Sequence, residues 1–247
     1  DPCITDPVSS ILGPNLLIWG TSFFTKSGSD PSFVSWHQDA NYWGLEPHHV
    51  LTAWIAFTPS RRENGCMRIL PGSHSIGSLA HRDTFDKNNL LTRGQEILVD
   101  VDESQVVDIE LEPGEMSLHH VGLVHGSEPN TSSIDRIGFA IRYIATDVKQ
   151  ISGRTTATLA RGVDEFSHFD LEPRPIREYD ETCRNFRERI ISSLDGGRES
   201  THSNAATVKD SFFSGASFCA RIRERSSASA LFKSASDCCG MTLSRRS

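Results

Sequence analysis

The 247-residue sequence contains no apolar run of the roughly 18 to 20 residues that a helix needs to span a bilayer. It also lacks an excess of basic residues, since 25 Lys and Arg stand against 32 Asp and Glu, for a net charge of −7. A general nucleic-acid binder needs a basic face for its phosphate contacts. The sequence therefore predicts no membrane span and no nucleic-acid partner, and it favours a small-molecule substrate. It leaves the oligomeric state open.

The six cysteines form no C-x-x-C pair and follow no regular spacing. Zinc knuckles and disulfide frameworks depend on such spacing, so neither is predicted, and a reducing, cytoplasmic setting is the expectation. The sequence begins at Asp1 without a charged-then-apolar leader. Because its first residues read like the middle of a domain, we expect an N-terminal part to precede them, and any targeting signal would lie there.

A βαβ rhythm of about 30 residues is absent, which argues against a doubly wound sheet. Residues 15–145 instead read as short strands separated by turn-forming stretches such as "SGSDPS" and "LEPGE". Such a pattern is typical of a sandwich or barrel. A short helix is predicted to end near Gly13, an amphipathic helix is predicted over residues 176–194, and the polar run 74–100 is predicted to be an excursion or lid at the mouth of a site.

The expected fold is mainly β: a double-stranded β-helix of the jelly-roll or cupin-like kind with flanking helices. Residues 1–198 would form this domain, without its N-terminal part. Residues 199–247 are rich in Ser, Ala and Arg and show no sustained period, so they are predicted to be a low-complexity, disordered tail.

The stretch "WHQDANYW", residues 36–43, places His37 and Asp39 one residue apart. Residues i and i+2 of a strand share a face, so both side chains are predicted to project together from one strand. A third ligand must come from elsewhere, and the run "LHHVGLVHGS" offers His119, His120 and His125. Two histidines and one carboxylate on one side of an octahedral ion form the facial triad of non-haem Fe(II) oxygenases. A zinc hydrolase with the same ligands is an alternative.

Arg136 is the feature that favours the oxygenase over the hydrolase. On the predicted strand "RIGFAIRY" it shares a face with Gly138 and Ala140, which leaves room for a small dicarboxylate beside its guanidinium. A guanidinium can hold a carboxylate with two parallel hydrogen bonds. A buried arginine without a partner costs on the order of several kcal/mol, which favours a ligand as its partner. The alternative is a salt bridge to Asp135 or Glu128.

Three stretches, "WHQDANYW", "TAWIAFTPSRRENGCMRILPGSH" and "HGSEPNTSSIDR", stand in the order and approximate spacing found in the phytanoyl-CoA dioxygenase family. The sequence resembles that family over about residues 8–145. Its members are Fe(II)/2-oxoglutarate oxygenases built on a double-stranded β-helix. The resemblance implies that iron is bound by His37, Asp39 and His125, and that the cosubstrate 2-oxoglutarate is held by Arg136 and Ser127, with Trp54 beside it and Ser22 as a further contact.

The activity implied by the resemblance is hydroxylation of an unactivated C–H bond of a small organic substrate. Dioxygen and 2-oxoglutarate would be consumed, succinate and CO2 released, and ascorbate would be a candidate reductant. Asp39 disfavours a halogenase, because relatives of that type resemble this family but carry a small residue in place of the carboxylate. The alternative function is a non-catalytic cupin-like binding module, or an inactive fragment of such an enzyme.

Overall fold

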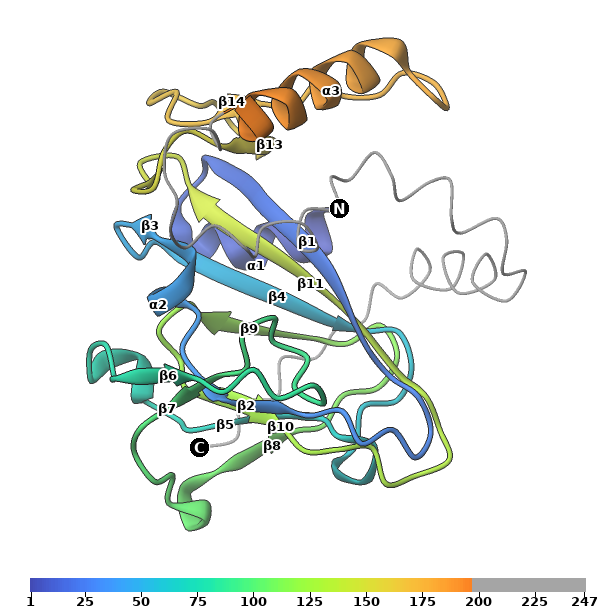
Figure 1. The fold of residues 1–247 in the computed structure, drawn as a ribbon. Helices are drawn as coiled ribbons and strands as arrows, with labels where there is room; N and C mark the ends of the chain where they lie inside the picture. The colour runs from blue at the N-terminus through green and yellow to red at the C-terminus, as the bar shows by residue number, and fades with distance from the viewer. Residues whose placement is uncertain (197–247) are drawn as a thin grey trace.

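A computed structural model of the chain describes residues 1–196 (Figure 1). The predicted boundary at residue 198 and the predicted tail 199–247 lie outside the described residues. Within the described part, no helix has the length and apolar character that a bilayer crossing requires.

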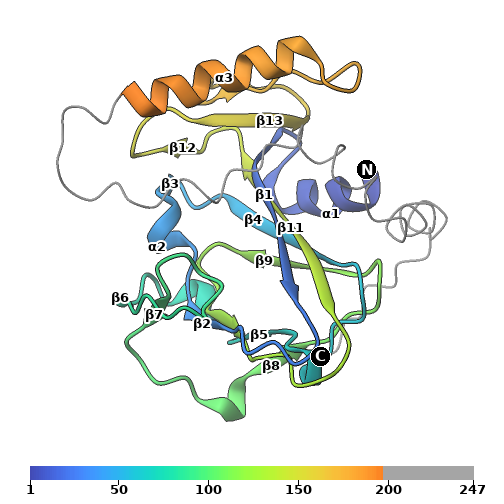
Figure 2. The ribbon, with the colours of Figure 1, turned by 45° about the vertical axis from the view of Figure 1, so that its right-hand side comes forward.

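Two sheets carry most of the chain, and the smaller one lies below the larger one in both views (Figures 1 and 2). The larger sheet has the strand order β14-β13-β1-β11-β4-β9 and the smaller one β2-β10-β5-β8. The bounds in the larger sheet are β1 Leu16–Lys26, β4 Val50–Ala56, β9 Met116–His120, β11 Arg136–Ala145, β13 Thr156–Arg161 and β14 Asp170–Leu171. Those in the smaller sheet are β2 Val34–His37, β5 Met67–Ile69, β8 Val107–Ile109 and β10 His125–Ser127. This arrangement is the predicted double-stranded β-helix, and the mainly β fold class is confirmed.

Short elements join and flank the sheets. Two further strand pairs are β3 (Leu45–Glu46) with β12 (Lys149–Gln150), and β6 (His81–Asp83) with β7 (Gln95–Ile97). The helices are α1 (Pro2–Leu12), α2 (Ala40–Trp43) and α3 (Glu181–Gly196), with 3-10 turns at η1 (Arg62–Asn64), η2 (Ser73–Ser75) and η3 (Glu103–Gln105).

Helix α1 covers the outer face of the larger sheet. Its Val8 is fully buried in a cluster with Ala53 of β4 and Ile141 and Tyr143 of β11. Because successive side chains of a strand point to opposite faces, the alternate residues of β11, which include Arg136, project to the inner face. Helix α1 therefore packs on one face of the larger sheet, and the polar side chains of the other face, such as Arg136, point toward the smaller sheet.

The predicted helix over residues 176–194 exists, but it begins later than its apolar spacing indicated. Helix α3 starts at Glu181, after Asp180, whose Oδ1 accepts hydrogen bonds from the backbone N–H groups of Thr182 (2.9 Å) and Cys183 (3.4 Å). These are N-cap contacts. Tyr179 precedes the cap with a φ of 55° and is 76% exposed, so the predicted first turn is wrong.

The excursion 74–100 forms the β6–β7 hairpin and lies along β2 (Figure 1). The N–H of Phe33 donates to the carbonyl oxygen of Asn88 at 3.0 Å, and the Ser35 hydroxyl donates to the carbonyl oxygen of Gln95. At the end of β2, the Gln38 N–H donates to His81 Nε2 at 3.0 Å. The excursion therefore supports the strand that carries His37.

Candidate metal centre

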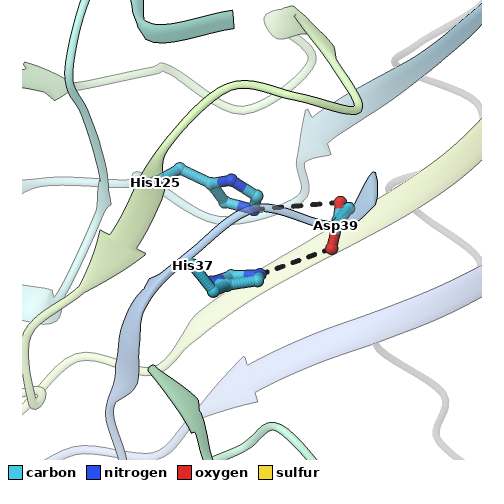
Figure 3. Close-up of side chains that lie close together, drawn as sticks. All are labelled: His37, Asp39 and His125. Atoms are coloured by element: carbon cyan, nitrogen blue, oxygen red, sulfur yellow. Dashed lines mark ion pairs between the residues drawn. The ribbon is translucent and has the colours of Figure 1, made fainter. Parts of the chain in front are cut away.

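His37 and Asp39 meet at the place where β2 ends. His37 is the last residue of β2, whereas Asp39 is the N-cap of α2 and has helical dihedral angles, φ −60° and ψ −34°. The interpretation that both side chains project from one strand face is therefore wrong. The turn after the strand nevertheless brings Asp39 Oδ1 to 3.3 Å from His37 Nε2 (Figure 3).

His125 reaches the same place from the neighbouring strand. In the pairing of β10 with β2 it stands directly opposite His37, and their ring centroids are 4.2 Å apart. Its Nε2 is 4.0 Å from Asp39 Oδ2, so the carboxylate faces both imidazoles (Figure 3). One ligand atom from each of the three residues lies within 4.8 Å of the others. The structure thus brings together the three predicted metal ligands.

Backbone carbonyl groups orient both imidazoles. The Nδ1 of His37 lies 2.9 Å from the Ser35 oxygen, and the Nδ1 of His125 lies 2.9 Å from the Leu123 oxygen. A carbonyl oxygen only accepts, so each Nδ1 donates a proton to its carbonyl and each Nε2 faces the carboxylate. Hydrogen bonds of this kind fix the tautomer and ring orientation of metal-binding histidines.

The protonation states also suit a cation. Burial, followed by the charge of His37, lowers the pKa of His125 to about 3. Burial alone would raise the pKa of Asp39, but the imidazoles of His37 and His125 and the Arg142 guanidinium hold it at about 2. At neutral pH the centre therefore offers an anionic carboxylate and a neutral His125 imidazole.

Arg136 begins β11 and is 2% exposed, with its Cζ 5.3 Å from the centre of the Trp54 ring. Its Nε is buried and has no hydrogen-bond partner within residues 1–196. The salt-bridge alternative is wrong: Asp135 accepts from the Gly28 N–H at 2.9 Å, and Glu128 pairs with Arg68 at 3.2 Å. Burial lowers the pKa of Arg136 to about 10, which still leaves it charged at neutral pH.

Lys26 is a second buried cation beside Arg136, and no motif in the sequence marked it. It is fully buried, and in the β1–β11 register it stands directly opposite Arg136. Its Nζ donates to Ser127 Oγ at 2.7 Å and to the carbonyl oxygen of Glu128. Burial and then the charge of Arg136 lower its pKa to about 7. Ser127, a predicted cosubstrate contact on the same strand as His125, is therefore bound to Lys26, which stands opposite Arg136.

The other predicted cosubstrate contacts lie along the inner face of the larger sheet. Trp54 is 5% exposed and packs on Gly138, where an added Cβ would lie 1.9 Å from Trp54 Cζ2. Ser22 contacts a different arginine, because its Oγ accepts from Arg142 NH1 at 2.9 Å. The role of Ser22 toward the cosubstrate stays a prediction.

The two competing histidines do not join the triad. His119 is buried with its ring centroid 5.0 Å from that of His125, outside the three-residue group. His120 is bound to backbone, since its Nε2 donates to the His48 oxygen at 2.9 Å and its Nδ1 accepts from the Gly122 N–H at 3.0 Å.

Comparison with known proteins places this site in a family. The family model described as phytanoyl-CoA dioxygenase (PhyH) matches residues 1–138. The chain belongs to the phytanoyl-CoA dioxygenase family. The predicted family and the fold that it implies are therefore confirmed.

Individual relatives agree with this assignment. The peroxisomal phytanoyl-CoA dioxygenase of Rattus norvegicus is 28% identical over 197 residues, which are 77% of this chain and 58% of the relative. A probable alpha-ketoglutarate-dependent hypophosphite dioxygenase of Stutzerimonas stutzeri is 32% identical over 156 residues, covering 61% of this chain and 52% of the relative. The chain thus spans about half to three fifths of these curated relatives.

Among solved structures, the apo form of the non-heme monooxygenase ThoJ is 38% identical with a TM-score of 0.69, covering 79% of this chain and 71% of that one. This relative is named as a monooxygenase, and the two relatives above are named as dioxygenases.

Proposed function

We propose that this protein is an Fe(II)- and 2-oxoglutarate-dependent oxygenase that hydroxylates an unactivated C–H bond of a small organic substrate and releases succinate and CO2. The observation that carries the proposal is a His-Asp-His triad accompanied by Arg136, a buried guanidinium without an ion-pair partner in the described part of the chain. A zinc hydrolase would use the triad but has no need of the arginine. Relatives named as dioxygenases and a monooxygenase support oxygen insertion.

The triad fits a ferrous ion. It offers two imidazole Nε2 atoms and a carboxylate from one side, the donor set of non-haem Fe(II) oxygenases, and leaves the other coordination positions to small ligands. Iron and 2-oxoglutarate would supply the oxygen-activating chemistry when bound. The buried His37 and His125 would present their Nε2 atoms in fixed tautomers, and the half-buried Asp39 would present its carboxylate.

The surroundings of Arg136 fit the far carboxylate of 2-oxoglutarate. Arg136 can hold that group with two parallel hydrogen bonds, the Ser127 hydroxyl can donate to it, and Lys26 adds positive charge. Ser127 lies two residues after His125 on β10, which is roughly 7 Å along a strand and about the length of a small dicarboxylate. One ligand of that length can therefore reach from the metal to Ser127, beside Lys26 and Arg136.

The test is binding and turnover of 2-oxoglutarate. Arg136→Met should raise the Kd for 2-oxoglutarate roughly 100-fold, because two charge-assisted hydrogen bonds are lost, and Arg136→Lys should restore part of the affinity. Arg82→Met, which removes an exposed arginine paired with Glu96, is the matched control and should leave the Kd unchanged. Turnover is measured as succinate formed under air with Fe(II) and ascorbate.

Three outcomes would contradict the proposal. Equal 2-oxoglutarate affinity of wild type and Arg136→Met would remove the cosubstrate assignment. Activity that depends on zinc and consumes no oxygen would favour the hydrolase. Metal binding without turnover, with diverse substrates, would favour the non-catalytic binding module.

A further inference from the structure

A second arginine, Arg142, shares the inner face of β11 with Arg136, six residues further along the strand. Its NH1 donates to Ser22 Oγ at 2.9 Å, and its Cζ lies 5.0 Å from the centre of the Trp43 ring. The Nε of Arg142 is buried and has no hydrogen-bond partner in residues 1–196. Arg142 is thus oriented by a hydroxyl group and an aromatic ring, with donor capacity left over.

Two more polar groups without partners stand next to Arg142. In the sheet register Thr52 of β4 is directly opposite Arg142, and His119 of β9 is directly opposite Thr52. Directly opposite residues lie on the same face, about 5 Å apart. Thr52 Oγ1 and His119 Nδ1 are buried, and neither has a hydrogen-bond partner in the described part of the chain. Since buried polar groups are normally satisfied, a row of three such groups indicates a ligand.

This row ends at the metal centre. The ring centroids of His119 and His125 are 5.0 Å apart. At the other end, Trp43 lies one helical turn after Asp39, and its N–H donates to the Asp39 carbonyl oxygen at 3.2 Å. A molecule bound by Arg142 would therefore lie beside the metal ligands, where a reacting C–H bond has to be.

The balance of charge identifies the kind of ligand. With iron and 2-oxoglutarate bound, Asp39 and the near carboxylate of the cosubstrate would neutralise the dication, and the far carboxylate would face Arg136 and Lys26. Arg142 would keep excess positive charge, because it forms no ion pair within the described residues and the nearby Asp39, the one carboxylate that acts on its charge, faces the two imidazoles. One guanidinium with neutral donors beside it suits a monoanion, and its planar fork suits a carboxylate.

We propose that Arg142 binds a carboxylate of the primary substrate, so that the substrate class is a carboxylic acid. Thr52 and His119 complete the contacts to its oxygens, and the tilted pair Trp43–Trp19, with ring centroids 5.3 Å apart, provides an apolar wall for its carbon skeleton. This inference rests on the proposed function, since it assigns the substrate of that same site.

The experiment uses the 247-residue chain loaded with Mn(II) and saturated with 2-oxoglutarate, so that the metal and Arg136 are already occupied. The probes are straight-chain monocarboxylates from acetate to octanoate, each paired with its primary amide, and binding is followed by tryptophan fluorescence. At least one acid should bind roughly 10- to 100-fold more tightly than its amide, the range of a charge-assisted hydrogen bond. Arg142→Met should abolish this preference and Arg142→Lys should keep part of it. Arg154→Met, at an exposed arginine paired with Asp170, is the matched control.

The outcomes separate this inference from the proposed function. If no acid, acetate included, is preferred over its amide while 2-oxoglutarate binds in an Arg136-dependent way, the proposed function stands and the inference is overturned. If Arg142→Met weakens 2-oxoglutarate binding as much as Arg136→Met does, Arg142 belongs to the cosubstrate site and the inference is again overturned. Failure of wild type to bind 2-oxoglutarate would remove the proposed function itself. The comparison of acid with amide is made on wild type, so it holds even where Arg142→Met does not fold.

Discussion

The buried ammonium group of Lys26 leads to a specific prediction about pH. Burial, and then the charge of Arg136, lower its pKa from 10.5 to about 7, while Glu128, Asp30 and Cys66 act in the opposite direction. A carboxylate bound beside Arg136 favours the charged form of Lys26. Binding of 2-oxoglutarate at a pH above about 7 should therefore be coupled to the uptake of a proton.

The size of the effect follows from the shift. Each unit of pKa corresponds to about 1.4 kcal/mol, or tenfold in a binding constant. If the bound carboxylate raises the pKa of Lys26 by about two, the Kd for 2-oxoglutarate is constant below about pH 7. The Kd then rises roughly 100-fold between about pH 7 and pH 9.

The assay is isothermal titration calorimetry of the Mn(II)-loaded protein across this range, in two buffers with different ionisation enthalpies, so that proton uptake is measured directly. Lys26→Arg keeps the charge and should flatten the pH dependence. Lys26→Met should bind weakly at every pH, and Lys149→Met, at an exposed lysine of β12, should behave like wild type. The same slope in wild type and Lys26→Met would refute the reasoning.

The same lysine affects stability in the ligand-free protein. Its pKa is about 7 when folded and about 10.5 when unfolded, so between these values the unfolded state binds more protons. The contribution of Lys26 to the free energy of unfolding therefore rises with pH through that window and is least favourable below about pH 7. Denaturant titrations of Lys26→Met should lack this rise.

Three further predictions concern the metal, the inner face and the outer face of the larger sheet. Asp39→Ala should raise the Kd for Mn(II) at least roughly 100-fold in calorimetry, because the only anionic member of the triad is removed; unchanged metal affinity would contradict the triad. Gly138→Ala should cost about 1 to 3 kcal/mol in urea unfolding, because its Cβ would lie 1.9 Å from Trp54 Cζ2; undiminished stability would show that Trp54 yields freely. Val8→Ala should cost roughly 1 to 3 kcal/mol but leave the Kd for 2-oxoglutarate unchanged, since Val8 packs on the outer face; weaker binding would contradict the division between the two faces.

The three candidate metal ligands and the class of fold could be predicted from the sequence because both depend on local patterns. Turn-forming residues divide the chain into short strands, and the alternation in β11 separates Arg136 from the residues that pack on α1. The spacing of His37, Asp39, His125 and Arg136 then matched a family, which supplied the roles.

Other features depended on how distant segments meet, which no local pattern encodes. Asp39 completes the triad from a helix cap because β2 ends at His37, and strand ends are set by tertiary hydrogen bonds. Only the register of β1 with β11 shows that Lys26 is a neighbour of Arg136. Likewise, only the register of β11 with β4 shows that Arg142 lies beside Thr52. The sequence by itself determined which groups can bind a metal and a carboxylate, whereas the tertiary structure decided which cations are buried without counterions, because burial and pairing arise from contacts between segments far apart in the chain.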